Sequence, residues 1–186
     1  MWLFLMTEVM FFGGMFGAYV IYRTWYPEAF KIASTATNVP LGAMNTVVLI
    51  VSSLTMALAV QSAQLGKKKM LVWMIILTMF FGAWFLGVKA IEYSEKWHHH
   101  HVPGANFIWE GDGGREVQIL YCLYFAMTGM HAVHMVVGLG IMTWLLLTAI
   151  KGHYTPKYYN PVEICGLYWH FVDIVWIFLF PMLYLI

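Results

Sequence analysis

The chain has 186 residues, of which 61% are apolar, 18% aromatic and only 10% charged, and its mean hydropathy is +0.71. This composition excludes an ordinary soluble domain and predicts an integral membrane protein. A net charge of +1, without basic clusters interleaved with exposed aromatic residues, excludes nucleic acid as a partner. We therefore expect a single all-α transmembrane domain over residues 1–186.

Five apolar runs are long enough to cross a hydrocarbon core as helices, which takes about 20 residues. The runs are continuous rather than alternating, which favours helices over barrel strands. They cover residues 2–22, 41–65, 70–91, 117–150 and 162–186. Residues 92–116 form the predicted extramembrane loop. The fourth run exceeds the bilayer thickness, so we expect it to tilt or to project into water.

The first two runs carry small residues at helical spacing. The first run starts at Trp2 without a basic leader or a cleavage site, so we expect it to insert and remain. Gly13 and Gly17 in this run, and Ser53 and Ala57 in the second, have the spacing that lets two membrane helices approach closely.

Loop charge predicts the orientation in the membrane. Gly66 is followed by three lysines at 67–69, and Lys151 and Lys157 lie in the connection after the fourth run. Basic loops favour the cytoplasmic side. We therefore expect a cytoplasmic amino terminus, an external carboxyl terminus and a location in the bacterial cytoplasmic membrane.

Several residues at the ends of the runs have simple structural interpretations. Asn160, Pro161 and Glu163 are a helix-start pattern, with Asn160 as the N-cap. The histidines at 98–101 are interpreted as a solvated loop rather than a metal tract. Cys122 and Cys165 are interpreted as small buried hydrophobes. Aromatic residues near the span ends are expected to anchor at the interfaces: Trp2, Trp25, Tyr26, Trp97, Trp109 and Tyr184.

A few ionisable residues lie inside the apolar runs, where such groups are costly and usually mark function. At about 1.5 Å of rise per residue, Glu8 and His170 both lie roughly 10 Å from the inner surface. His131 and His134 reach the same leaflet and, three residues apart, share a helical face. Asp173 lies one turn nearer the membrane centre. These residues predict one intramembrane polar layer, in which Glu8 and His134 interact between the first and fourth helices.

Three interpretations of this layer compete. Interhelical hydrogen bonding that fixes packing is the commonest role of a buried histidine in a bundle. A haem or transition-metal enzyme is an alternative, because histidine and glutamate are acceptable ligands. A proton-coupled transporter with a relay through Glu8 and Asp173 is another, but it predicts an inverted repeat that is not apparent.

Five short motifs together support the packing interpretation. They are Trp2–Leu5 with Glu8–Phe12, Asn45–Leu49 with Ser52 and Ser53, Glu92 and Tyr93, Thr128–His134, and Trp169–Trp176. In this order and spacing the chain resembles subunit III of haem-copper cytochrome c oxidases over almost its whole length. The five-helix form also resembles subunit III of quinol oxidases and a protein of nitric-oxide-reducing systems, so the electron donor stays open.

The resemblance implies a subunit of a terminal respiratory oxidase that holds no cofactor and performs no chemical step. It implies packing against catalytic subunit I and other respiratory subunits, binding of phospholipid, and maintenance of proton uptake, with haem and copper in the partners. The residues of the polar layer would serve that support: Glu8, His131, His134, His170 and Asp173. Lipid contact is expected at Trp2, Lys151 and His153.

The chain differs from the larger family members in two features, and both affect which partners we expect. Those members have two further helices before the first one here, and their lipid cleft lies between that pair and the other five. Either another subunit supplies the missing wall, or the lipid site is reduced. The long segment 97–116 is expected to contact a neighbouring subunit on the outer face.

Overall fold

The computed structural model describes residues 1–28, 30–31, 39–98 and 114–184, and it confirms a bundle of membrane-length helices. The described part of the chain contains five such helices: α1 (Trp2–Trp25), α3 (Val39–Gln64), α4 (Lys68–His98), α5 (Gly114–Ile150) and α6 (Asn160–Tyr184). Each is long and apolar enough to span a hydrocarbon core. The chain is therefore an integral membrane protein.

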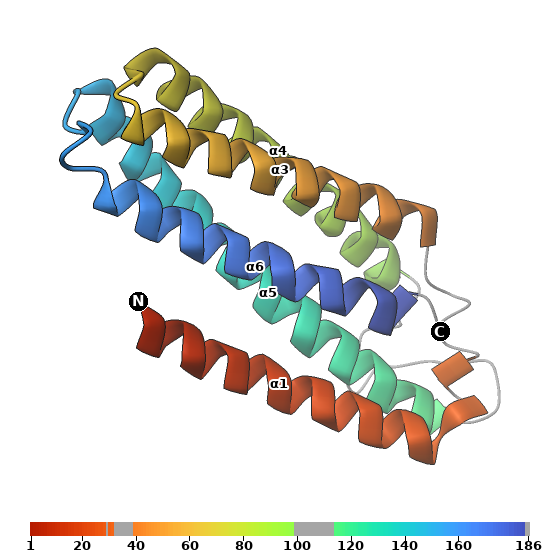
Figure 1. The fold of residues 1–186 in the computed structure, drawn as a ribbon. Coiled ribbons are helices and arrows are strands. Elements are labelled where there is room, and N and C mark those ends of the chain that lie inside the picture. Colours follow the sequence, from red (N-terminus) through yellow and green to blue (C-terminus); the bar gives the residue numbers. More distant parts are fainter. Residues whose placement is uncertain (29, 32–38, 99–113, 185–186) are drawn as a thin grey trace.

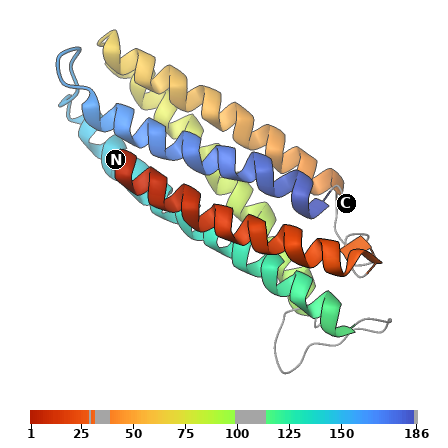
Figure 2. The same cartoon turned by 60° about the horizontal axis from the view of Figure 1, so that its bottom comes forward.

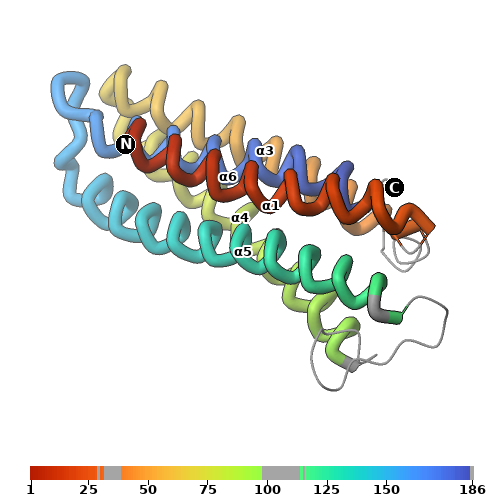
Figure 3. The backbone as a smooth tube through the Cα atoms, turned by 90° about the horizontal axis from the view of Figure 1, so that it is seen from below, coloured from red at the N-terminus to blue at the C-terminus, as the bar shows by residue number. Residues whose placement is uncertain are grey.

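Helix α6 lies at the centre of the bundle. It packs against α3 on one side and α5 on the other, while α4 runs behind, in contact with α3 and α5 (Figure 1). Helix α1 lies at the edge, alongside α5 and α6 (Figure 2). The start of α1, the α3–α4 turn and the α5–α6 turn gather at one end of the bundle (Figure 3). The basic segments of the two turns thus lie on one side, as the orientation prediction requires.

Helix α4 is longer than the sequence predicts. It continues to His98 instead of ending at residue 91, so the first part of the predicted loop 92–116 is helical. The reason is that Glu92 and Lys96 are buried, which keeps this segment packed in the bundle rather than solvated. Of the histidine tract, His98 ends the helix, and residues 99–101 lie outside the described residues, as does Trp109.

Both turns at the basic end close on a glycine with positive φ. Gly66 has φ 67° and Gly152 has φ 79°, a region that residues with a Cβ rarely adopt.

Helix α6 begins one residue earlier than the predicted N-cap at Asn160 implies. The Tyr159 carbonyl accepts a hydrogen bond from the Glu163 amide at 3.2 Å, and Asn160 is already helical. In the same connection the hydroxyls of Tyr154 and Thr148 are 2.6 Å apart, and partial burial raises the pKa of Tyr154.

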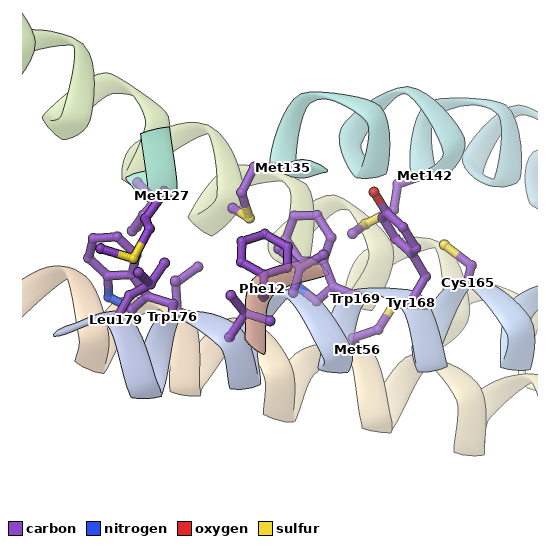
Figure 4. Packing of buried hydrophobic residues seen from close by; sticks show 14 of the residues in the cluster. Phe12, Met56, Met127, Met135, Met142, Cys165, Tyr168, Trp169, Trp176 and Leu179 are labelled. Atoms are coloured by element: carbon purple, nitrogen blue, oxygen red, sulfur yellow. The ribbon is translucent and has the colours of Figure 1, made fainter. Parts of the chain in front are cut away.

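The indole of Trp169 is fully buried in the apolar core, part of which Figure 4 shows from close by. Its ring lies between α4 and α5 at two glycines: a Cβ added at Gly82 would meet Trp169 Cη2 at 2.8 Å, and one at Gly138 would meet Cζ3 at 2.9 Å. Its Nε1 donates to Ser52 Oγ on α3 at 3.0 Å. One side chain of α6 therefore contacts the three helices around it.

The glycines of α1 do not serve a helix contact within the described chain. An added Cβ would meet nothing within 4 Å at Gly13, Gly14 or Gly17. The close approach expected at Gly13 and Gly17 is therefore wrong for this bundle, because the face that carries them points away from α5 and α6. Helix α1 is also the least buried of the five spans.

Two expectations about single side chains are also wrong. Tyr184 is buried, with 2% of its surface exposed, because its hydroxyl bonds to charged groups inside the bundle; it is no interfacial anchor. Cys122 is exposed, whereas Cys165 is buried as expected. Trp2, Trp25, Tyr26 and Trp97 are exposed near helix ends, as interfacial anchors would be.

We expect Gly138→Ala to destabilise the bundle. The new methyl group would overlap Trp169, and overpacking of this kind costs about 1–3 kcal/mol. Gly140→Ala is the matched control, because that position of the same helix has open space and alanine favours helix by about 1 kcal/mol. The check is the free energy of unfolding in mixed micelles. Equal stability of the two variants would contradict the packing role of Trp169.

Candidate functional site

Glu8 and His134 form the contact that the sequence predicts between α1 and α5. Glu8 Oε2 lies 3.2 Å from His134 Nε2, and the two side chains are 20% and 13% exposed. The Phe12 ring contacts the His134 ring at 5.5 Å between centroids, and the hydroxyl of Tyr168 on α6 donates to the His134 carbonyl at 3.0 Å. Three helices thus meet at this pair.

A hydrogen bond within α5 orients the His134 ring toward Glu8. His134 Nδ1 is 2.8 Å from the Met130 carbonyl, which only accepts, so Nδ1 carries a hydrogen. Nε2 is thereby turned toward the Glu8 carboxyl group, 3.2 Å away. The ionisable groups of α1 and α5 therefore face each other inside the membrane.

His131 lies in a different setting, although it is only three residues from His134. It is 1% exposed and packs between the rings of Phe85 and Trp176, at centroid distances of 5.4 and 5.1 Å. Within the described residues neither ring nitrogen has a hydrogen-bond partner. His131 therefore faces α4 and α6, whereas His134 faces α1.

His170 and Asp173 belong to the contact between α6 and α3. His170 Nδ1 lies 2.7 Å from the Ser53 hydroxyl. Asp173 is 2% exposed; Ser53 lies close enough to interact with its carboxyl group, but no described residue makes a hydrogen bond of good geometry to either oxygen. These two residues face away from the Glu8–His134 pair.

The predicted polar layer is thus divided among three separate places in the bundle. The structure brings Glu8 and His134 together, places His170 beside Asp173 at Ser53, and leaves His131 among aromatic rings. No group of three or more His, Cys, Asp or Glu side chains converges as a metal site in the described ranges. Each of these places is a contact between neighbouring helices.

The most extensive polar contact is one that the sequence analysis missed. Lys89 and Glu92, one turn apart on α4, form an ion pair of 2.8 Å with 5% and 7% of their side chains exposed. Tyr184 on α6 and Tyr124 on α5 both donate to Glu92 Oε1 at 2.7 Å. Lys89 Nζ donates to the Tyr184 hydroxyl at 2.6 Å. We call these four residues the Lys89–Glu92 cluster.

Aromatic faces surround the cations of α4. Lys89 Nζ lies 4.8 Å from the centre of the Trp176 ring, and Lys96 Nζ lies 4.8 Å from the Tyr124 ring and 5.3 Å from the Tyr121 ring. Such contacts stabilise a desolvated cation by about 2 kcal/mol. The cluster therefore joins α4, α5 and α6 near their ends opposite the basic turns.

The sequence held a signal for this cluster. Lys89 lies inside the run 70–91, so the cost of an intramembrane charge should have singled it out as it did Glu8. Glu92, three residues later, shares its helical face. The signal was lost because ending the helix at 91 placed Glu92 in a solvated loop.

The fold and these contacts define a class of protein: a polytopic membrane bundle whose ionisable groups connect its own helices. The comparisons with known proteins identify the family. A family model described as cytochrome c oxidase subunit III matches residues 1–186. The chain belongs to this family, subunit III of the haem-copper oxidases, which serve cytochrome c or quinol oxidases.

Curated relatives of both kinds are similar over nearly the whole chain. Cytochrome c oxidase subunit 3 of Gallus gallus is 31% identical over 191 residues, covering 98% of this chain and 66% of the relative. Quinol oxidase subunit 3 of Bacillus subtilis is 28% identical over 184 residues, covering 99% and 84%. The chain thus spans about two thirds of the length of its cytochrome c oxidase relatives.

We expect Glu92→Gln to lower the free energy of unfolding by about 3 kcal/mol or more, because it leaves Lys89 buried without its counter-charge. The double variant Lys89→Met with Glu92→Gln should recover much of this loss, since no charge is then left unpaired. Glu95→Gln is the matched control, being the same change at an exposed position of α4. Unfolding in mixed micelles gives the double-mutant cycle, and strictly additive losses would contradict the pairing.

We expect Glu8→Leu to loosen α1. An interhelical hydrogen bond in a membrane contributes about 0.6 kcal/mol on average, so amide hydrogen exchange in α1 should accelerate roughly threefold. Glu8→Gln, which can still hydrogen-bond His134, should have a smaller effect. Thr7→Val is the control, because the Thr7 hydroxyl bonds only within its own helix, to the Phe4 carbonyl. Unchanged exchange in Glu8→Leu would show that the pair does not hold α1.

Proposed function

We propose that this chain is the supporting subunit of a terminal respiratory oxidase, packing against catalytic subunit I while haem and copper lie in the partner subunits. The observation that carries the proposal is the match to the subunit III family along the whole chain. Membership of that family implies a complex with other oxidase subunits. Subunit I is the partner expected from the resemblance.

The contacts of the ionisable residues support a structural role. Glu8 is engaged with His134, His170 with Ser53, and Lys89 with Glu92. Each contact joins two or more helices or fixes a charge against aromatic rings, and the three histidines do not converge. Such an arrangement favours a rigid scaffold for a neighbouring subunit over a catalytic centre of its own.

An apolar cleft of about 570 Å³ between α1, α5 and α6 supports the proposal of bound phospholipid. Its walls are apolar side chains such as Phe4, Val137, Ile141 and Ile164, with His134 at the inner end. The cleft lies toward the basic end of the bundle, at the start of α1 and the close of α5. One acyl chain in this cleft would fill space that α1 leaves open.

The residues expected to contact lipid lie at the same end. Trp2 is exposed beside Met1, which lines the cleft, and Lys151 and His153 are exposed in the α5–α6 turn. Cations at the bilayer surface attract anionic headgroups. We therefore assign the headgroup to this turn and the acyl chain to the cleft.

The proposed role also includes maintenance of proton uptake by the oxidase. The Glu8–His134 pair brings a carboxyl group and an imidazole ring together, and it lies in the half of the membrane that loop charge assigns to the cytoplasm. We propose that this pair and the lipid beside it keep the neighbouring face of subunit I hydrated and in place. The pair performs no chemical step.

Quinol is the alternative electron donor of the complex, since relatives in both cytochrome c and quinol oxidases match this chain at similar identity. The donor binds elsewhere in the assembly, so the contacts within this chain serve either oxidase. Oxygen consumption by the purified complex with reduced cytochrome c and with a quinol identifies the donor.

We expect gentle solubilisation and affinity purification of the tagged chain to recover a much larger haem-containing polypeptide in equal amount. The measurement is the haem spectrum of the purified fraction together with mass spectrometry of its subunits. Tagging at the end of α6 and at the start of α1 in separate preparations controls for a tag that blocks assembly. Recovery of a stable lone chain from both preparations would reject the supporting-subunit role.

A further inference from the structure

A small cavity opens between α3 and α6. It has a volume of about 230 Å³ and contains the polar side chains of Ser53, His170 and Asp173. Its other walls are apolar, and Leu54, Ala57 and Ile177 among them are exposed on the outer surface of the bundle. We call this cavity the α3–α6 notch.

Asp173 is the unusual member of the notch. Its side chain is 2% exposed, yet neither carboxyl oxygen makes a hydrogen bond to any described residue. A buried polar group without a partner costs about 1–3 kcal/mol, and more when it is charged. The neighbouring Ser53 hydroxyl lies beside the carboxyl group, but its hydrogen bond of good geometry is with His170 Nδ1, at 2.7 Å. The notch therefore contains carboxyl oxygens for which the described residues provide no well-placed donor.

Depth in the membrane limits what can satisfy Asp173. At about 1.5 Å per residue it lies ~20 Å from Asn160 and ~16 Å from Tyr184 along α6, so it is near the middle of a hydrocarbon core of about 30 Å. Lipid headgroups remain at the two surfaces, and acyl chains carry no hydrogen-bond donor at that depth. A donor from outside this chain is then either another protein segment or water.

The surroundings of the notch favour a protein segment. Leu54 and Ile177 are 60% and 44% exposed, and the exposed Ala57 has a small side chain that leaves room for the backbone of another helix. A mostly apolar rim around one polar centre is the pattern of a helix contact in a membrane, where a polar side chain fixes register.

We propose that the α3–α6 notch receives a hydrogen-bond-donating side chain from a transmembrane helix of another oxidase subunit. The inference rests on the assembly proposed above and adds the face on which a partner helix docks. The donor reaches the Asp173 carboxyl group at the membrane centre, and the exposed apolar residues of α3 and α6 pack around it. In the assembled oxidase the carboxyl group is then satisfied.

The test uses the intact oxidase with a photo-crosslinking amino acid in place of Ile177. We expect irradiation to yield an adduct between this chain and another subunit. Asp173→Val should lower the yield of that adduct roughly fivefold, as loss of an interhelical hydrogen bond of about 1 kcal/mol or more implies, whereas Asp173→Asn, which still hydrogen-bonds, should retain most of it.

A second variant keeps the test independent of Asp173. Ala57→Phe fills the notch from the exposed side of α3 and leaves Asp173 itself unchanged. It should lower the yield of the adduct as well. The amount of haem-containing polypeptide that co-purifies with each variant is the control for general loss of assembly. Adducts with lipid alone, or a subunit adduct indifferent to both Asp173→Val and Ala57→Phe, would overturn the proposal.

The two proposals fail in different ways. If the unsubstituted chain does not co-purify with a haem-containing polypeptide, the supporting-subunit role fails. If it does co-purify and the notch yields only lipid adducts, that role stands and the docking face is elsewhere.

Discussion

The constraint on which this structure depends is that a charge in hydrocarbon must be paired inside the protein. Lys89 and Glu92 are the strongest case, because both are almost fully buried and each uses the other together with Tyr124 and Tyr184. Taking such charges out of water offsets most of their attraction, so the cluster adds little net stability. It instead fixes which faces of α4, α5 and α6 meet, since any other arrangement would leave a charge unpaired.

Helix α6 connects the Lys89–Glu92 cluster to the rest of the bundle. Trp169 and Trp176, two turns apart, both point inward: one packs against the glycines of α4 and α5, and the other lies over Lys89 and donates to Thr46 on α3 at 3.1 Å. His170 and Asp173 lie between them and turn toward α3. A segment that first suggests an active site is thus the central packing element, with its polar groups divided between the core and the outer face.

Helix α1 is attached differently, and this difference bears on function. It has the fewest buried residues, and its polar ties are the Glu8–His134 pair and a hydrogen bond from the Tyr19 hydroxyl to the Met182 carbonyl. Its glycine face meets nothing in the chain, and the apolar cleft separates its start from α5 and α6. A loosely packed helix beside a cleft, on a rigid core, suits a subunit whose outer faces are completed by lipid and by partners.

The sequence by itself determined the class, the five spans and the family, because hydrophobic run length and the cost of intramembrane charge are local properties of the chain. It also predicted the Glu8–His134 contact, since rise per residue places both groups at one depth, and the structure confirmed it. Only the tertiary structure decided that His131 and His134 face different neighbours, that Glu92 and Tyr184 are buried, and that Asp173 lacks a donor. Depth follows from counting residues, but the rotation of each helix about its axis depends on packing against its neighbours, and no segment specifies that alone.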